Sequence, residues 1–267
     1  MNLIVFPDGT TITSTALTQA AIDQAMQLLS CAALGLVAVP APLTLAVMSG
    51  QFVAGYAVST NVYTGLSVSG SGIPLGTVIT GIIGDQVVLS NAATATGSIQ
   101  ATVVDSNAYA KVRVGYSPKG QPGWGPDEDV VFVRCVTKDD DYTRMRDLTG
   151  LGQDAIYTIT DVFSRCWQVF WTVYGPNAID NARALKSAFT TVPYFEYQLA
   201  QSLLYLQPST SEPIRAPENK DGQWWNRVDW RADFFEQITE QITNQTVASV
   251  EVLARTGSGP AFDITVQ

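Results

Sequence analysis

The fold is decided by residues 156–189, which read IYTITDVFSRCWQVFWTVYGPNAIDNARALKSAF. The first half of this stretch alternates with a period of two, which places Trp167 and Trp171 on one face of a strand and Phe170 on the other. Because both faces are mostly apolar, we predict a central strand that is covered on each side. The Gly-Pro pair that follows ends the strand, and the apolar spacing after it predicts a helix with proline near its first turn.

The neighbouring segments extend this strand into a sheet. Apolar spacing predicts a helix at 17–33 and a shorter one at 194–202. Alternation predicts a long strand at 231–242, joined by a tight turn at 243–245 to a last strand at 246–255. Further strands are predicted at 112–116 and 129–136, and exposed polar loops at 138–153 and 207–222. This order predicts an α+β fold, a mainly antiparallel sheet flanked by two or three helices.

Residues 42–105 differ in composition from the rest of the chain. They hold two charged residues, Asp85 and Asp105, and no basic residue. Short β-branched runs between glycine-rich turns predict an inserted all-β sandwich or barrel, with a disordered low-complexity linker as the alternative. The predicted domains are therefore a core at 1–41 and 106–257, the insert at 42–105, and a C-terminal tail at 258–267 that orders against a partner.

The composition indicates a surface that is covered by other subunits. Hydrophobic residues make up 46% of the chain and charged residues 15%, whereas an average domain has about 25% charged residues. The net charge of −9 argues against sequence-specific binding of duplex DNA, which uses Lys and Arg to neutralise phosphate.

Several classes of function lack their usual residues. The chain has no histidine, the commonest general base and metal ligand, so we predict no catalytic site, no metal site and no cofactor. Cys31, Cys135 and Cys166 lie in apolar runs without a CxxC spacing and are expected to be buried free thiols. Residues 24–49 are uncharged, but two prolines break them and no basic residue flanks them, so no membrane span or signal peptide is expected.

Two stretches resemble the phage neck or tail-terminator (head–tail joining) family. The more specific is the strand, Gly-Pro-Asn-Ala and helix run at 167–185. The other comprises VRVGY at 112–116 through Trp124, DVVFVR at 129–134 and DDYTR at 140–144. The insert, with VSGSGIPLGTVI at 68–79, is similar to a small β module that is common in phage structural proteins.

The resemblance implies a structural protein of the virion, assembled in the host cytoplasm. It implies a hexameric ring of this chain at the head–tail junction, which terminates the tail tube and docks it to the neck connector. The implied partners are connector and neck proteins, the tail tube and, as a further candidate, the sheath. Genome DNA would pass through the ring without sequence-specific binding. The family carries no catalytic residues, so none is transferred.

Two polar and aromatic clusters are candidate interface residues. Asp139, Asp140 and Asp141 are expected to pair with Arg144 and Arg146 of the same or a neighbouring subunit, with a Ca²⁺ or Mg²⁺ site as the alternative. The tryptophans and arginines near the C-terminus form the second cluster, for which a platform for single-stranded nucleic acid or sugar is the alternative. Its members are Trp224, Trp225 and Arg227, with Trp230 and Arg231 nearby.

Two other functions remain open at this level. In the first, the insert recognises a host glycan or a capsid component, and the core is an anchor for it. In the second, the chain is a carboxylate-dependent glycosidase.

Overall fold

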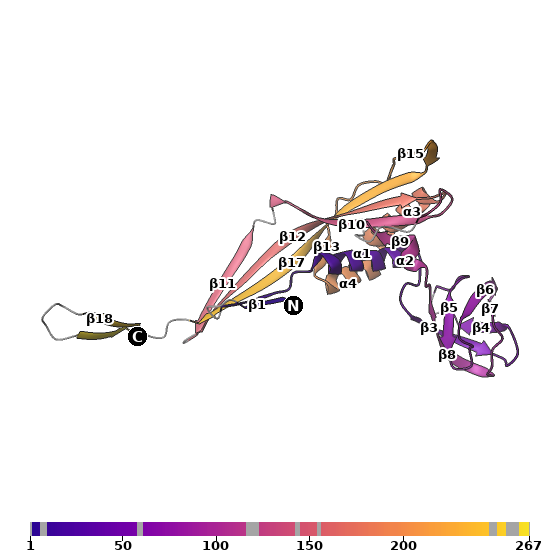
Figure 1. Ribbon diagram of the computed structural model, residues 1–267, viewed down its shortest axis with the longest axis horizontal. Helices are drawn as coiled ribbons and strands as arrows, with labels where there is room; N and C mark the ends of the chain where they lie inside the picture. Colours follow the sequence, from indigo (N-terminus) through magenta and orange to yellow (C-terminus); the bar gives the residue numbers. More distant parts are fainter. Residues whose placement is uncertain are drawn as a thin grey trace.

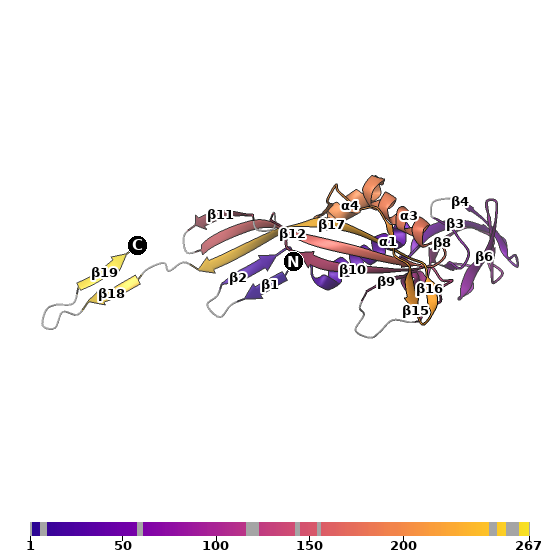
Figure 2. The ribbon, with the colours of Figure 1, turned by 90° about the horizontal axis from the view of Figure 1, so that it is seen from above.

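The computed structural model describes residues 2–5, 10–57, 61–115, 123–141, 145–153, 156–245, 250–254 and 262–266. The molecule is elongated, with a nine-stranded sheet along its length and a small barrel at one end (Figure 1). Helices cover the middle of the molecule, and the sheet continues beyond them on the side away from the barrel (Figure 2).

Two 19-residue strands, β12 (Ile156–Tyr174) and β17 (Arg227–Gln245), run antiparallel over their whole length and form the centre of the sheet. The half nearer the barrel is widened by β10 (Val130–Lys138) and by β9 (Val112–Val114), which is parallel to β10. The far half is widened by strands on both sides of the pair. The remaining strands of the sheet are β1 (Asn2–Val5), β2 (Thr11–Ser14), β11 (Arg146–Gln153), β13 (Leu204–Leu206) and β14 (Ile214–Arg215).

Helices pack on one face of the half nearer the barrel. The Thr18 hydroxyl accepts a hydrogen bond from an N–H of the first turn of α1 (Gln19–Ala33), which lies along β9 and β10. α3 (Ala178–Thr191) lies on β12 and β17, and α4 (Pro193–Gln201) lies on β13. Gly175 has a φ of 113° between β12 and α3, where a Cβ would collide with Asp129, so this turn requires glycine.

Large aromatic side chains fill the space between helices and sheet. Trp171 of β12 stacks on Trp230 of β17 with ring centroids 4.3 Å apart, and Phe189 of α3 lies 5.2 Å from Trp171. The Trp171 indole N–H donates to the Ser30 hydroxyl of α1 at 2.8 Å. Each such ring buries about 150–250 Å². This aromatic layer therefore anchors the helices to the sheet.

Six strands between α1 and α2 (Ala108–Lys111) close into a barrel. Its buried interior is built from apolar residues such as Leu43, Leu45 and Val87. In order around the barrel the strands are β3 (Ala41–Val47), β4 (Val53–Ala57), β7 (Gln86–Leu89), β6 (Thr77–Ile83), β5 (Ser67–Gly70) and β8 (Gly97–Val104). Ala41 and Val103 are paired across β3 and β8, so the chain leaves the barrel beside the point where it came in.

Polar contacts tie the barrel to the helical layer. The Tyr63 hydroxyl donates to the Asp105 carboxylate at 2.8 Å and accepts from the Val37 N–H at 3.0 Å. Asp105 is 4% exposed and also lies 3.5 Å from the Lys111 ammonium group. The Asn61 side chain donates to the Gly35 carbonyl at 2.6 Å. The segment that leads into the barrel and the segment that leads out of it are thus both held by the loop that carries Asn61 and Tyr63.

The predicted fold class is wrong. Strands make up 48% of the structure and helices 20%, so the protein is mostly β, with a closed six-stranded barrel and a curled sheet. Within the described residues there are four helices, one of them a single turn. The prediction of a mainly helix-flanked sheet failed because the helices cover only part of the sheet, and because segments taken for loops add strands to it.

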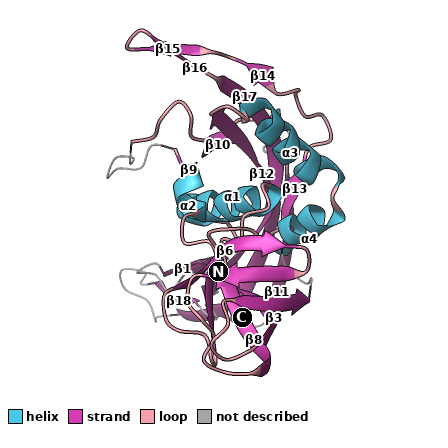
Figure 3. Cartoon of the chain, turned by 90° about the vertical axis from the view of Figure 1, so that its right-hand side faces the viewer, coloured by secondary structure: helices cyan, strands magenta, loops and turns pink. Residues whose placement is uncertain are grey.

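Three local predictions are corrected by the strand pairing. Residues 138–153 are not a loop throughout, since β11 pairs with the first half of β12. Residues 207–222 hold β14 and one strand of a hairpin, β15 (Glu218–Lys220) with β16 (Gln223–Trp225), which projects from the end of the sheet (Figure 3). β18 (Val250–Ala254) pairs with β19 (Phe262–Val266) and not with β17, whose own strand includes residues 243–245.

Candidate assembly interface

The face of the sheet opposite the helices is only partly covered. Side chains that point away from the helices, among them Phe132, Phe170 and Phe235, are half-buried in the described part of the chain. Their neighbours Val133, Trp171 and others on the helix side are buried. The prediction that β12 is covered on both faces is therefore wrong for the described residues of a single chain, although its apolar residues on both faces were correctly identified.

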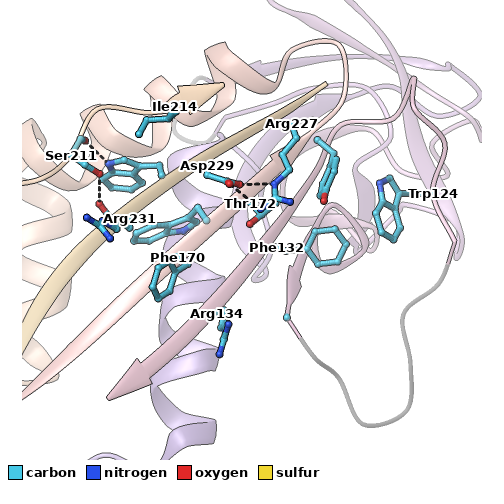
Figure 4. A pocket seen from close by; sticks show the side chains of 14 residues that line it. Trp124, Phe132, Arg134, Phe170, Thr172, Ser211, Ile214, Arg227, Asp229 and Arg231 are labelled. Atoms are coloured by element: carbon cyan, nitrogen blue, oxygen red, sulfur yellow. Dashed lines mark hydrogen bonds and ion pairs between the residues drawn. The ribbon is translucent and has the colours of Figure 1, made fainter. Parts of the chain in front are cut away.

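A hollow of about 690 Å³ lies on this open face. Phe132 and Phe170 form part of its floor, and Arg134, Arg231 and Arg227 stand around it (Figure 4). The lining combines aromatic rings with guanidinium groups, which are the side chains most often enriched at protein interfaces. A hollow of this composition can receive an apolar or acidic side chain of another protein.

Four aromatic rings continue the hollow toward the projecting hairpin. Trp124 lies 4.9 Å from Phe132 and 5.8 Å from Trp225 between ring centroids, and Tyr174 packs edge-on against Trp225 at 6.2 Å. The ammonium group of Lys220 lies 5.5 Å from the rings of both tryptophans. The buried indole N–H of Trp124 has no hydrogen-bond partner among the described residues.

Arg227 is the centre of a hydrogen-bonded group at the edge of the hollow. Its guanidinium donates two hydrogen bonds of 2.9 Å to Asp229 and one of 3.2 Å to Glu218. The hydrogen bond to Asp229 is the main cause that raises the pKa of Arg227. The Tyr174 hydroxyl donates to Glu218 at 2.8 Å, which lowers the pKa of that carboxylate. Burial, followed by this hydrogen bond, raises the pKa of Tyr174 to about 12.

Comparison with known proteins identifies the family. Residues 92–258, well over half of the chain, match the family described as phage neck terminator protein. The chain belongs to the phage neck terminator family. It is thus a structural protein of the bacteriophage neck, where head and tail meet, and it interacts with other head–tail proteins. No curated protein matches the chain.

The residues that match the family include some elements of the neck terminator and leave out others. They include the helices α3 and α4, the long strands and the open face, but within the barrel they include only β8. Residues 1–91 lie outside the match. In the described residues no helix is long and apolar enough to span a membrane.

The acidic cluster lies far from the aromatic hollow. Asp139 and Asp140 follow the last residue of β10, at the opposite end of this strand from Trp124. Arg146 pairs with the buried Asp161 at 2.7 Å and stacks on Phe163 at 4.5 Å. Arg144 lies outside the described residues. No group of three potential metal ligands occurs in the described part of the chain, Asp139 to Asp141 included.

The predicted tryptophan and arginine cluster is divided by the sheet. Trp225 and Arg227 border the hollow, and Trp224 on β16 is 69% exposed. Trp230 also contributes to the lining of the hollow, but it is 2% exposed and its ring stacks on Trp171 in the core beneath the helices. Within β17, Trp230 points to the helices and Arg227 and Arg231 point to the open face, because neighbouring residues of a strand point to opposite faces.

Sequence reasoning missed a buried network around Glu236, which is 1% exposed. Its carboxylate accepts hydrogen bonds from the Arg165 guanidinium at 2.7 and 2.9 Å, from the Trp167 indole at 2.7 Å and from the Leu17 N–H at 2.6 Å. The network joins β12, β17 and the segment before α1. Its signal was visible in the sequence, because Glu236 interrupts a row of alternating apolar residues between Phe234 and Ile238.

Proposed function

We propose that this neck terminator acts as one subunit of a hexameric ring that ends the tail tube and docks it to the neck connector. The observation that carries the proposal is the aromatic and arginine-lined hollow on the uncovered face of the sheet. It combines half-buried rings with an unpartnered, buried Trp124 N–H among the described residues. A neighbouring subunit would cover the half-buried rings.

In this role the protein needs no catalytic group. Asp139 to Asp141, Arg146, Trp224, Trp225 and Arg227 are proposed as contact residues, together with Arg144. The net charge of −9 fits a ring through which DNA passes without sequence-specific contacts. Connector proteins on one side, and tube and sheath proteins on the other, are the proposed partners.

Native mass spectrometry and negative-stain electron microscopy of the full chain test the ring. Closed annuli of six copies are expected, and a protein that stays monomeric at high concentration would contradict the proposal. Trp224→Ala removes an exposed indole near the hollow. This variant is expected to weaken the association of subunits into the hexamer. Tyr197→Ala is the matched control, because this ring on α4 is 61% exposed but lies on the helical side.

Phage assembly without the protein tests its place in the virion. Tail tubes of irregular length that do not join to heads are expected, and purified protein should restore joining. Tails of normal length that join heads without it would refute the terminator role.

A second candidate function belongs to the barrel, which we propose to be a separately folding domain of residues 42–105. Its surface carries one charged residue, Asp85, besides the buried Asp105 at the junction, yet Phe52, Leu75 and Ile83 are 51%, 100% and 67% exposed. Such a surface suits recognition of a host glycan or a capsid component. Because Ala41 and Val103 are adjacent, a short linker can replace the barrel. Rings and joined particles that persist without it would assign the junction role to the core.

A further inference from the structure

The half of the sheet away from the barrel forms an arm that is one layer thick. The strand order in the arm is β1-β2-β17-β12-β11, and no described helix lies over it (Figures 1 and 2). A single-layer sheet needs a partner for its apolar face. The arm therefore raises the question of what covers it in the assembled particle.

The two faces of the arm differ in chemistry. Four isoleucines form a row across four strands, because Ile4 pairs with Ile12, Ile12 with Ile242, and Ile242 with Ile159. This row continues the face that the helices cover in the other half. The opposite face is rich in threonine: Thr11, Thr13, Thr158, Thr160 and Thr243.

Several apolar side chains of the arm are exposed. Six apolar side chains are between 38% and 68% exposed: Leu3, Ile4, Val5, Met145, Leu148 and Tyr157. Leu3, Ile4 and Val5 belong to β1 at one edge of the arm, and Leu148 belongs to β11 at the other. The exposed apolar side chains are therefore concentrated on the two edge strands.

Among the described residues, backbone groups at both edges of the arm have no strand partner. The Thr15 N–H donates to the Thr239 carbonyl, which fixes the alternation of hydrogen bonds across the antiparallel strands. From this alternation and the register of the strand pairs, the N–H groups of Leu3 and Val5 point outward from β1, and that of Leu148 points outward from β11. Residues 2–5 contain neither a charge nor a proline, the usual protections of an edge strand.

We propose that β1 of one copy pairs with β11 of the next copy, so that the arms form one continuous sheet around the ring. β1 and β11 both run in the direction of β17, so a copy related by rotation about an axis along the strands brings these edges together in parallel. The contact is head-to-tail, which closes into a ring under cyclic symmetry. The inference rests on the proposed ring and names the element that holds it together.

Proline variants at the two edges test the pairing in the full chain. Leu3→Pro and Leu148→Pro each remove one outward N–H without breaking a bond inside the sheet. Each variant alone is expected to be folded by circular dichroism and monomeric by mass photometry. Leu3→Thr and Leu148→Thr are the matched controls, because they shorten the same side chains, keep the N–H groups, and are expected to form rings.

An equimolar mixture of the two proline variants tests the pairing more specifically than either variant alone. The Leu3→Pro variant keeps an unaltered β11 edge, and the Leu148→Pro variant keeps an unaltered β1 edge. One β1–β11 contact can therefore form between them, and a dimer is expected although each variant alone stays monomeric. Should proline unfold the chain, Val5→Lys and Leu148→Lys place a charge on each edge instead, with the same expected masses.

Each outcome decides between the two proposals. Rings formed by the edge variants would overturn the edge pairing and leave the ring itself standing. Dimers formed by Leu148→Pro alone would show that two β1 edges pair with each other, which also overturns the head-to-tail contact. Monomeric wild-type protein would overturn the ring, and with it this inference. Edge variants that form rings but fail to bind purified tail tubes would assign the edges to the tube protein.

Discussion

Replacing Glu236 by glutamine is expected to lower the free energy of unfolding by about 3 kcal/mol. All the groups that face this carboxylate are donors: the Arg165 guanidinium, the Trp167 indole and the Leu17 N–H. Glutamine keeps the size of the side chain but replaces one acceptor oxygen with an NH₂ group. At least one buried donor then loses its acceptor, and Arg165 loses its countercharge.

The magnitude follows from burial. Removing one partner of a buried ion pair costs about 3–5 kcal/mol. The lower end applies here because the Arg165 side chain is 28% exposed and can partly turn to water, whereas Glu236 cannot. For a chain of this size, the loss corresponds to a fall of about 6–10 °C in Tm.

Urea denaturation of the wild type and of the Glu236→Gln variant, at the same protein concentration, measures the change in the free energy of unfolding. Glu240→Gln is the control, because Glu240 lies on the same face of β17 and accepts a hydrogen bond from the Ser14 hydroxyl, which glutamine can also accept. Its expected change is below about 0.5 kcal/mol. The double variant Arg165→Met with Glu236→Leu should not recover the loss, because the Trp167 indole N–H and the Leu17 N–H still lose their acceptor. A Glu236→Gln protein as stable as the wild type would refute the network as described.

Three further predictions follow from the buried polar groups. Burial raises the pKa of Tyr174 to about 12, above the value of about 10 in the unfolded chain. The folded state therefore holds this proton to higher pH, and the free energy of unfolding should fall as the pH rises from about 10 to 12. Denaturation measured across this pH range should show a smaller fall for Tyr174→Phe. Burial also raises the pKa of Cys31 to about 12 and of Cys166 to about 11, so both thiols should react with a thiol reagent at pH 8 only after denaturation, as absorbance would show. Tyr63→Phe deprives Asp105 of a hydrogen bond and should cost about 1–2 kcal/mol at the barrel junction, with faster proteolysis of the connecting segments than in the wild type.

Local patterns located the long elements well. The helices predicted at 17–33 and 194–202 are present as α1 and α4, and the strand predicted before the Gly-Pro pair is β12. These segments have apolar residues at spacings that only one type of element satisfies. The family was also visible in them, since the strand, Gly-Pro-Asn-Ala and helix run lies within the residues that match it.

The same patterns could not identify β11. Residues 146–153 are polar and contain two glycines, as in a loop, yet they pair with the first half of β12. That pairing is a contact between strands, and it depends on the length by which β12 and β17 extend past the helices. The candidate site could not be resolved from the sequence for a similar reason: Trp225 packs on Trp124 near the hairpin, whereas Trp230, close to it in sequence, is buried in the core.

The sequence by itself determined the apolar faces, the low charge and the long elements, because each of these is a property of neighbouring residues. Only the tertiary structure decided that helices cover one face of half the sheet. It alone revealed the open aromatic hollow, the isoleucine row and, among the described residues, the two unpaired edges of the arm. Coverage depends on which distant segments meet, and the four helices of the described residues are too few to enclose a sheet built on two 19-residue strands.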